Sequence, residues 1–524
     1  MVRLCTVFIV FLSMFLLPIT HATPRDSGAQ VSEISNQAAQ HTSSVYHQAA
    51  IDSLAELVTY KTVAKPGLTP TTNPEFIGFK QALARLSQAF GLDYSDHGYV
   101  VLIGLGRQQD KVGVITHGDV QPADAEQWQH DPYTLDQHSV PGRLIARGTE
   151  DDKGAIVTAL YAMKSIKELG IELDKRIELM VYMAEESNWD PLREFLKTFT
   201  PADINITIDA KYPVVTAEKG WSKIAFQIPN VLNSAQSITN QKTNQKTDSQ
   251  PLLTYFGGGY ISSQVPQQAK AIVLGANQQM ISKLKAAAKT QNQMRYRFEA
   301  SNNKVTIFAE GKATHSSTPQ NGVNALTHLA QVLSEFSWPK SQASLTVAFV
   351  NDMIGLGLYA EKFGDIAYAD SFMGKMTLAP TIIEQTDTAS KVNINLRRPR
   401  GKSAELLDEQ TMKALVQWQN ARQVKLQSIE TYWGQPLVVE DAPHLSTLLN
   451  VFEQYTGISD PQPVSIGGST NSKLFPNALS FGPAMPGVEY TGHTENEFIT
   501  VEQLRLNLKM YAAVLVELAG KPKR

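Results

Sequence analysis

Apolar residues along this chain alternate between short continuous runs and stretches with helical spacing. A stripe with a period near 3.6 over 76–90 predicts a helix, and Asn73 and Pro74 in front of it are typical of a helix start. A second helix is predicted over 155–169. Continuous apolar runs predict buried strands at 99–103, 112–116, 177–184 and 204–208. Because these strands alternate with helices, we expect an α/β fold with a doubly wound, mostly parallel sheet.

Around Gly220 the pattern changes to that of an α+β unit. Strands are predicted at 305–309, 345–350 and 392–396, and a helix at 321–336. Residues 234–250 are polar, and Asn-Gln-Lys-Thr at 240–243 repeats at 244–247, which predicts a disordered surface insertion. Helical and strand patterns resume from about 404. We therefore expect a second, inserted domain within the first.

The N-terminus has the pattern of a secretory signal peptide. Arg3 precedes a mostly apolar run over 4–19, and the small residues Thr20 and Ala22 suit a cleavage site. An uncleaved anchor is the alternative interpretation. The single cysteine, Cys5, lies inside this segment, so the mature chain can form no disulfide. We expect an exported product, periplasmic or secreted, with no membrane association after cleavage.

Charge is nearly balanced along the chain. The sequence has 47 Lys and Arg against 50 Asp and Glu, a net charge of −3, without a basic block or stripe. Nucleic acid is therefore not an expected partner.

Five short segments carry side chains of the kind that bind metal ions. They are His117-Gly118-Asp119, Asp151-Asp152, Glu185-Glu186, Asp209 and His493. Each of the first four lies where an apolar run ends or a helix begins, which is where α/β enzymes place their chemistry. Two imidazoles with several carboxylates suit a hydrolytic pair of Zn²⁺ ions that share one carboxylate.

Each segment alone has an ordinary explanation. His117 with Asp119 can be a hydrogen-bonded loop pair, and Asp151 with Asp152 can favour the dipole of a helix start. The two glutamates and Asp209 can lie in solvated turns, and His493 can lie in a surface loop. Their order and common placement at the ends of elements favour a metal site.

The segments in combination resemble a known family. The motifs are Ile-Thr-His-Gly-Asp-Val-Gln-Pro-Ala at 115–123, Ala-Arg-Gly-Thr-Glu-Asp-Asp-Lys-Gly at 146–154, Glu-Glu-Ser at 185–187 and Gly-His-Thr at 492–494. They resemble the ArgE/DapE/carnosinase-type di-zinc metallopeptidases, the M-twenty peptidases, and within these the PepV-like dipeptidases. The resemblance runs from about residue 46 to the C-terminus, apart from the repeat insertion.

The resemblance implies a role for each candidate ligand. Asp151 is the expected bridging ligand of two Zn²⁺ ions, for which Mn²⁺ or Co²⁺ could substitute. His117 and Asp209 are expected to complete one zinc site, and Glu186 and His493 the other.

Four further residues receive roles from the same resemblance. Glu185 is the expected general base, and Asp119 the acid that orients an imidazole. In the inserted domain, His315 is expected to polarise the scissile carbonyl and Arg397 to hold the substrate carboxylate. A surface loop for His315 and a solvated strand end for Arg397 are the alternatives.

The implied activity is hydrolysis of dipeptides or other short peptides with a free N-terminus, through a metal-bound hydroxide. One alternative is an N-acyl-amino-acid amidohydrolase or carboxypeptidase with the same metals. Another is a non-catalytic peptide-binding protein on the same fold. A short peptide is the expected partner, and a monomer is favoured over a homodimer because the inserted domain is long enough to supply the lid.

The expected organisation combines these elements into two domains and an N-terminal extension. The parts are a signal peptide (1–22), a flexible lead-in (23–43), a catalytic domain in two parts (44–222 and 404–524) and an inserted α+β lid domain (223–403).

Overall fold

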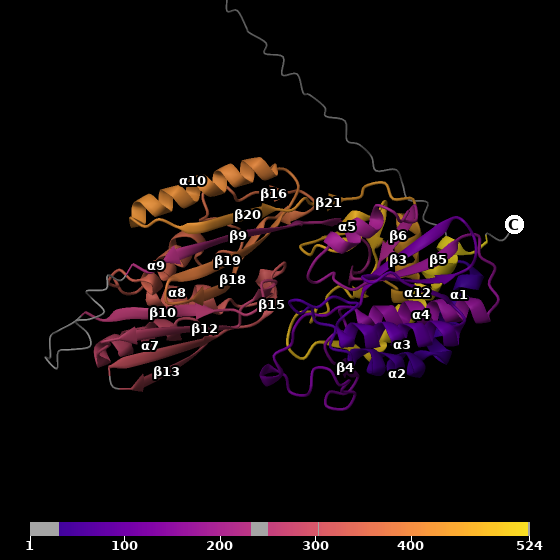
Figure 1. Cartoon of the computed structure of the whole chain (residues 1–524), viewed down its shortest axis with the longest axis horizontal. Coiled ribbons are helices and arrows are strands. Elements are labelled where there is room, and N and C mark those ends of the chain that lie inside the picture. Colours follow the sequence, from indigo (N-terminus) through magenta and orange to yellow (C-terminus); the bar gives the residue numbers. More distant parts are fainter. Residues whose placement is uncertain (1–30, 232–249, 302, 522–524) are drawn as a thin grey trace, which may run out of the picture.

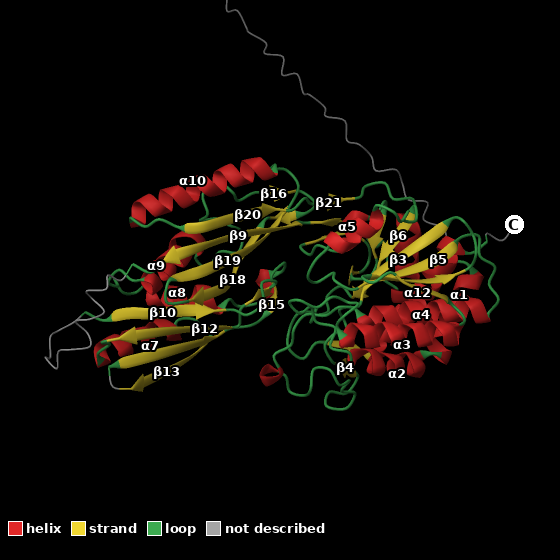
Figure 2. Cartoon of the chain, in the orientation of Figure 1, coloured by secondary structure: helices red, strands yellow, loops and turns green. Residues whose placement is uncertain are grey.

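The computed structural model describes residues 31–231, 250–301 and 303–521, which form two bodies joined side by side (Figure 1). Each body contains one large sheet with helices packed on it (Figure 2). The expected signal peptide and nearly all of the expected insertion at 234–250 lie outside the described residues. Among the described residues, no helix combines the length and apolarity needed to cross a bilayer.

The first body is built on a nine-stranded sheet. Along the sheet the strands are β1 (Asp93–Asp96), β2 (Val100–Leu105), β5 (Arg176–Tyr182), β3 (Lys111–His117), β6 (Ile204–Thr207), β23 (Ala478–Ser480), β8 (Val215–Glu218) and β21 (Leu437–Val438), with β22 (Val464–Ile466) also on β8. The strands from β5 to β23 are parallel, whereas β1, β2 and β21 pair antiparallel with their neighbours. The expected mostly parallel sheet is therefore parallel at its centre and mixed at its edges.

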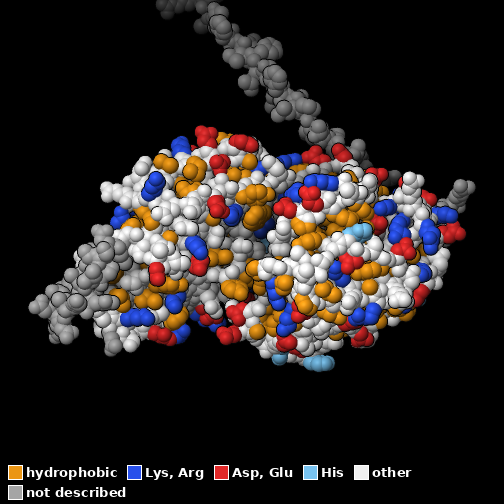
Figure 3. Space-filling view, viewed as in Figure 1, with side chains coloured by type: hydrophobic (Ala, Val, Ile, Leu, Met, Phe, Trp, Pro, Cys, Tyr) orange, Lys and Arg blue, Asp and Glu red, His pale blue; other side chains and the backbone are white. Residues whose placement is uncertain are grey.

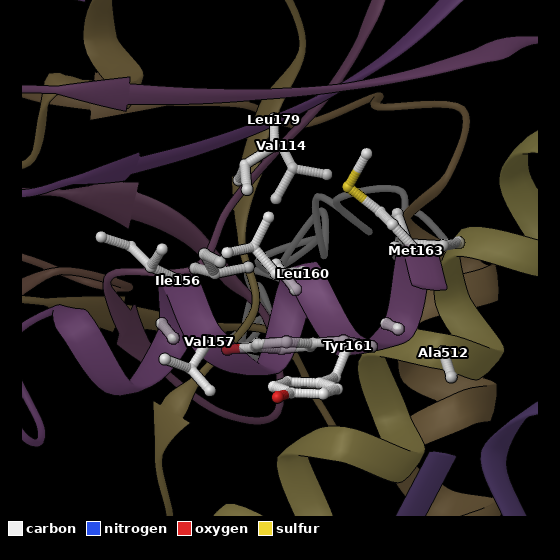
Figure 4. Close-up of a cluster of buried hydrophobic side chains, with 14 of the residues drawn as sticks. Val114, Ile156, Val157, Leu160, Tyr161, Met163, Leu179 and Ala512 are labelled. Carbon is white, nitrogen blue, oxygen red and sulfur yellow. The ribbon is translucent and has the colours of Figure 1, made fainter. Parts of the chain in front are cut away.

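Helices cover both faces of this sheet. They are α1 (Glu33–Val45), α2 (His47–Val58), α3 (Pro74–Phe90), α4 (Lys153–Glu168), α5 (Asp190–Leu196), α11 (Leu445–Thr456) and α12 (Val501–Ala519). Val114 of β3 and Leu179 of β5 face Leu160 of α4 in the main core (Figure 4). Ala512 of α12 belongs to the same core. The next residue of β3, Ile115, packs on the opposite face beside Leu192 of α5. This alternation buries the central strands on both sides.

The expected flexible lead-in is wrong for its second half. Residues 33–43 belong to α1, which begins after Ser32, whose side chain accepts a hydrogen bond from the Ser35 amide. Ser35, Ala38, Ala39 and Thr42 are buried at helical spacing. These small side chains let α1 lie closely against α12, so a polar composition concealed a packing face.

The second body is an antiparallel sheet of eight strands. Along the sheet they are β13 (Arg295–Ser301), β14 (Lys304–Glu310), β12 (Gln268–Leu274), β10 (Leu252–Gly258), β18 (Thr377–Gln385), β19 (Ala389–Arg398), β9 (Gly220–Pro229) and β20 (Gln427–Trp433). Its helices are α7 (Gln278–Lys289), α8 (Ala325–Leu333), α9 (Gln342–Phe349) and α10 (Ala404–Arg422). The strand predicted at 345–350 is wrong, because Ser341 and Ser344 form a capping box that starts α9 there.

The second body extends beyond the expected end at 403. Leu407, Leu415 and Trp418 of α10 belong to the same core as the eight-stranded sheet, and β20 pairs with β9. The prediction that the segment after 404 returns to the first body is wrong up to Trp433, since an amphipathic helix does not reveal which sheet it covers. The described second body therefore runs from Gly220 to Trp433.

The chain crosses between the bodies twice at one place. It leaves β8 for β9 through Lys219, and it returns from β20 to β21, which pairs with β8. The Gly434 amide donates to the Trp221 carbonyl at 3.0 Å. A Cβ atom on Gly220 would lie 2.0 Å from the Gly434 carbonyl oxygen, so a side chain at 220 would force the two crossings apart.

Four two-stranded ladders lie beside the large sheets. They are β11 (Gln264–Val265) with β15 (Thr314–His315), β16 (Ala369–Asp370) with β17 (Gly374–Lys375), β24 (Pro483–Ala484) with β7 (Ala210–Lys211), and β25 (Phe498–Thr500) with β4 (Arg143–Ile145). The first two belong to the second body, and the last two join distant segments of the first.

Candidate metal centre

The candidate ligands meet at the carboxyl ends of the parallel strands. His117 is the last residue of β3, Glu186 lies in the turn after β5, and Asp209 lies just beyond β6. Strands β5, β3 and β6 are adjacent and parallel, so their ends lie at one edge of the sheet. Asp151 comes from the turn before α4, and His493 from the loop before β25.

Asp151 lies between the two candidate imidazoles. Its Oδ1 lies 3.0 Å from His117 Nε2, and its Oδ2 lies 3.0 Å from His493 Nε2. The hydroxyl of Tyr490 donates to the same Oδ2 at 2.7 Å. The carboxylate is nearly buried, with 5% of the side chain exposed. One oxygen facing each histidine is the arrangement that a bridging ligand requires.

The two remaining carboxylates each lie beside a different imidazole. Asp209 Oδ2 lies 3.7 Å from His117 Nε2, and Glu186 Oε1 lies 2.7 Å from His493 Nε2. The structure thus brings together all five residues expected as ligands.

Asp152 is a further member of this cluster. Its ligand atoms lie within 4.8 Å of those of His117 and Asp209. Its Oδ2 accepts a hydrogen bond from the Thr116 hydroxyl, whereas its buried Oδ1 has no hydrogen-bond partner. Asp152 belongs to one of the five candidate segments, but the family resemblance assigned the bridging role to Asp151 and no role to Asp152.

Asp119 contacts the candidate site through two groups, its main-chain carbonyl and its carboxylate. Its main-chain carbonyl lies 2.9 Å from His117 Nδ1, closer than its carboxylate oxygen at 3.5 Å. The carboxylate accepts the amide hydrogens of Glu185 and Glu186 at 2.9 and 3.0 Å. The expected orienting contact to the imidazole therefore comes first from the carbonyl, and the carboxylate fixes the glutamate turn.

Glu185 has a free oxygen next to the cluster. Its Oε1 is buried without a hydrogen-bond partner, and burial, followed by the charge of Asp209, raises the pKa of this carboxyl well above its usual value. Closely spaced buried carboxylates are unfavourable unless protons or cations neutralise them. The donor set and the unpaired oxygens of Glu185 and Asp152 fit bound cations at this place.

Two buried glutamates, Glu497 and Glu150, connect the loop of His493 with the turn of Asp151 through hydrogen bonds. Glu497 Oε1 accepts the Asp151 amide at 3.0 Å, and Glu497 Oε2 faces Arg147 Nη1 at 2.7 Å. In the other direction, Glu150 Oε2 accepts the Thr491 amide at 2.6 Å, and burial raises the pKa of Glu150 to about 8. Each ligand loop thus donates hydrogen bonds to a carboxylate from the other. Sequence reasoning missed both, although Glu150 lies within the quoted motif at 146–154 and Glu497 follows the motif at 492–494 by three residues.

His315 reaches the centre from the second body. Its ring centroid lies 4.8 Å from that of His493, with an interplanar angle of 72°. Burial, followed by the charges of His493 and Arg397, holds the pKa of His315 well below its usual value. The Ser317 amide donates to Nδ1 at 3.3 Å, so the proton of the neutral ring lies on Nε2.

Arg397 lies near the centre but behind its wall. Only 4% of the residue is exposed, and its guanidinium donates to Asn395 Oδ1 at 3.1 Å and to Ser316 Oγ at 3.4 Å. It is absent from the described residues that line the cavity next to the metal centre. Its expected contact with a substrate carboxylate therefore requires a rearrangement of the residues that separate it from the cavity.

The cavity next to the metal centre has a volume of about 650 Å³ and is lined by both bodies. A hollow where the two bodies face each other is visible in Figure 3. The second body closes on a ligand residue directly, since Ser263 Oγ lies 3.1 Å from His493 Nδ1 and Gln264 donates to the His493 carbonyl at 3.0 Å.

Known proteins share this fold over most of the chain. Human carnosine dipeptidase 1 superposes with a TM-score of 0.59 at 15% identity, over 93% of this chain and 99% of its own. The dipeptidase Dug1p of Saccharomyces cerevisiae does so with a TM-score of 0.56 at 14% identity, over 92% and 98%. These similarities concern the fold.

Sequence comparison agrees with the fold. The Beta-Ala-Xaa dipeptidase of Lactobacillus delbrueckii subsp. lactis is 28% identical over 423 residues, 80% of this chain and 84% of the relative. Residues 113–517 match peptidase family M20/M25/M40 and include all five candidate ligands. The chain therefore belongs to peptidase family M20/M25/M40.

Proposed function

We propose that this chain is a zinc-dependent dipeptidase that hydrolyses dipeptides or other short peptides with a free N-terminus. The observation that carries the proposal is Asp151, whose two oxygens face one imidazole each, next to the unpaired carboxylate of Glu185. The name of the Lactobacillus relative, a Beta-Ala-Xaa dipeptidase, supports the same class of substrate.

Five residues would hold the ions. His117 and Asp209 would hold one Zn²⁺, and Glu186 and His493 the other, with Asp151 shared between them. Imidazole and carboxylate ligands suit Zn²⁺, and Mn²⁺ or Co²⁺ could take its place. When bound, such a pair supplies Lewis acidity to the scissile carbonyl and to water.

The chain's own residues would move the protons. Glu185 takes a proton from the attacking water and passes it to the leaving amine. His315 donates from Nε2 to the carbonyl oxygen as negative charge develops there. The second body acts as a lid that brings His315 to the centre and excludes water. Arg397 receives the substrate carboxylate once the residues that separate it from the cavity rearrange.

Replacing Glu185 tests this assignment. We expect Glu185→Gln protein to lose at least about a thousandfold in kcat on dipeptides such as Ala-Ala, because the proton acceptor is lost, while its zinc content stays at that of the wild type. The exposed Glu194→Gln is the matched control. Retained turnover in Glu185→Gln protein would exclude Glu185 as the base.

A substrate panel separates the dipeptidase from its nearest rival. Turnover of free dipeptides but not of N-acetylated ones supports the proposal. The reverse preference identifies an N-acyl-amino-acid amidohydrolase, and cleavage of long peptides from the C-terminus identifies a carboxypeptidase.

We also propose that the protein is exported, to the periplasm or the medium, through cleavage after residue 22, and that it works as a monomer. The sequence of residues 1–22 supports export. N-terminal sequencing of the exported product tests the cleavage site, and sedimentation analysis tests the oligomeric state.

A further inference from the structure

The cavity next to the metal centre contains three lysines that have no place in the proposed mechanism. Lys211, Lys219 and Lys375 all line it. The acidic residues of the same lining are Asp151, Glu185, Glu186 and Asp209, which all belong to the metal centre. Away from the metal centre, the described wall of the cavity therefore carries only positively charged side chains.

None of these lysines forms an ion pair with a described carboxylate within 4.0 Å. Lys219 is buried, with 8% of the residue exposed, and its ammonium donates to the main-chain carbonyl of Lys375. Burial alone lowers the pKa of Lys219. Lys375 is exposed and lies over the ring of Tyr359, with its Nζ 4.8 Å from the centroid.

The carboxylate next to Lys219 in sequence is already occupied. Both oxygens of Glu218 accept hydrogen bonds from the loop beyond β22: Thr470 donates from its amide at 2.9 Å and from its hydroxyl at 2.7 Å, and Ser472 donates at 2.9 Å. Glu218 is 1% exposed. A buried ammonium with one acceptor has two donors left, and it would bind an anion that enters the cavity.

The positions of Lys219 and Lys375 indicate which part of a substrate they would contact. Thr377 also lines the cavity and pairs across the sheet with Arg397, the residue proposed for the terminal carboxylate. Lys375 lies two residues before Thr377, and the ammonium of Lys219 donates to the main-chain carbonyl of Lys375. Lys219 and Lys375 therefore lie on the side of the cavity that would receive the residue after the scissile bond.

We propose that the cavity selects dipeptides whose C-terminal residue has an acidic side chain, with Lys219 and Lys375 as the specificity-determining residues. This inference rests on the proposed dipeptidase function and adds to it the class of substrate. The second carboxylate of such a dipeptide would accept the free hydrogens of Lys219 and neutralise Lys375.

Matched dipeptides test the preference. We expect wild-type kcat/KM to be at least about tenfold higher for Ala-Glu than for Ala-Gln, mainly through KM, because a charge-assisted hydrogen bond replaces a neutral one. Glu-Ala and Gln-Ala carry the same side chains before the scissile bond and should differ less than about threefold. Raising the salt concentration should reduce the Ala-Glu preference, because Lys375 is exposed to screening.

Lysine substitutions test the residues. In Lys375→Gln and Lys219→Met proteins we expect the Ala-Glu to Ala-Gln ratio to fall at least about fivefold. Lys391→Gln, an exposed lysine of β19 that pairs with Glu384, is the control and should keep the wild-type ratio. An equal loss on both dipeptides would mean that the lysines hold the terminal carboxylate, and it would overturn the proposal.

A binding measurement separates this inference from the proposed function. Zinc-loaded Glu185→Gln protein is titrated calorimetrically with Ala-Glu and with Ala-Gln. Tighter binding of Ala-Glu supports the lysine proposal even if the wild type turns over neither dipeptide, an outcome that would contradict the dipeptidase function alone. Equal affinities, with turnover of both dipeptides by the wild type, overturn the lysine proposal and leave the dipeptidase function standing.

Discussion

Glu497 holds the turn that carries Asp151, and its replacement tests how far the metal centre depends on this buried carboxylate. Its Oε1 accepts the amides of Gly148, Glu150 and Asp151 at 3.0, 2.9 and 3.0 Å. Its Oε2 faces Arg147 at 2.7 Å, and the side chain is fully buried. In Glu497→Ala protein, three amides lose their acceptor and one buried guanidinium loses its counter-charge.

The cost follows from these contacts. Removing one partner of a buried ion pair costs about 3–5 kcal/mol, and a buried amide without an acceptor costs about 1–3 kcal/mol. Because water can enter the space left by the carboxylate and serve the amides, we expect a total loss of about 4 kcal/mol for Glu497→Ala. Glu497→Gln keeps an acceptor oxygen and should lose about half as much.

Urea unfolding of the zinc-free protein, followed by circular dichroism, measures this loss. The control is Glu489→Ala, whose exposed side chain pairs with Lys312 at 2.9 Å and should change the free energy of unfolding by less than about 1 kcal/mol. Adding Arg147→Met to Glu497→Ala should recover at least about 1 kcal/mol, since the unpaired charge is then gone. Zinc should also bind at least about tenfold more weakly to Glu497→Ala protein, as for other residues that support metal ligands. A loss below about 1 kcal/mol with unchanged zinc affinity would refute the reasoning.

Three further outcomes follow from the structure. Burial lowers the pKa of His444 to about 4, so the unfolded chain binds a proton between pH 6.5 and 4 that the folded protein does not. The free energy of unfolding should therefore fall by up to about 3 kcal/mol as the pH drops through this window. A His444→Gln variant whose free energy of unfolding kept the same dependence on pH would contradict this. Chelation of zinc should lower the melting temperature, because an ion at about a hundred times its Kd contributes about 2.7 kcal/mol; readded zinc should restore it in the wild type but not in His117→Ala protein. Gly220→Ala should destabilise the protein by about 1–3 kcal/mol in urea unfolding, because its Cβ would lie 2.0 Å from the Gly434 carbonyl oxygen, and an unchanged midpoint would show that the crossings can separate freely.

The ligands could be predicted from the sequence because their positions follow from local pattern. Val112–Thr116 predicts a strand, β3 (Lys111–His117) confirms it, and the end of a parallel strand is where a ligand-binding residue is expected. The helical spacing of apolar residues predicts a helix over 155–169, and α4 (Lys153–Glu168) confirms it. A known family motif then assigned roles to residues that spacing alone left open.

The remaining features depend on contacts between distant segments. Glu497 and Asp151 are 346 residues apart, and Lys219 and Lys375 are 156 apart, so no local pattern indicates that they meet. The packing of α1 on α12 was hidden by its polar composition. The choice of sheet for α10 depends on tertiary packing, which amphipathicity alone does not specify.

The two crossings between the bodies make the second body an interchangeable module. Because the chain enters at Gly220 and leaves at Gly434 through adjacent backbone segments, the first body needs only a short bridge to close the gap. Exchange of everything between these glycines for the corresponding unit of a relative would replace Lys375 and His315 together, while Lys219 and all five metal ligands stay in place. Such a chimeric enzyme would combine the lid residues of one relative with the metal ligands and Lys219 of this chain.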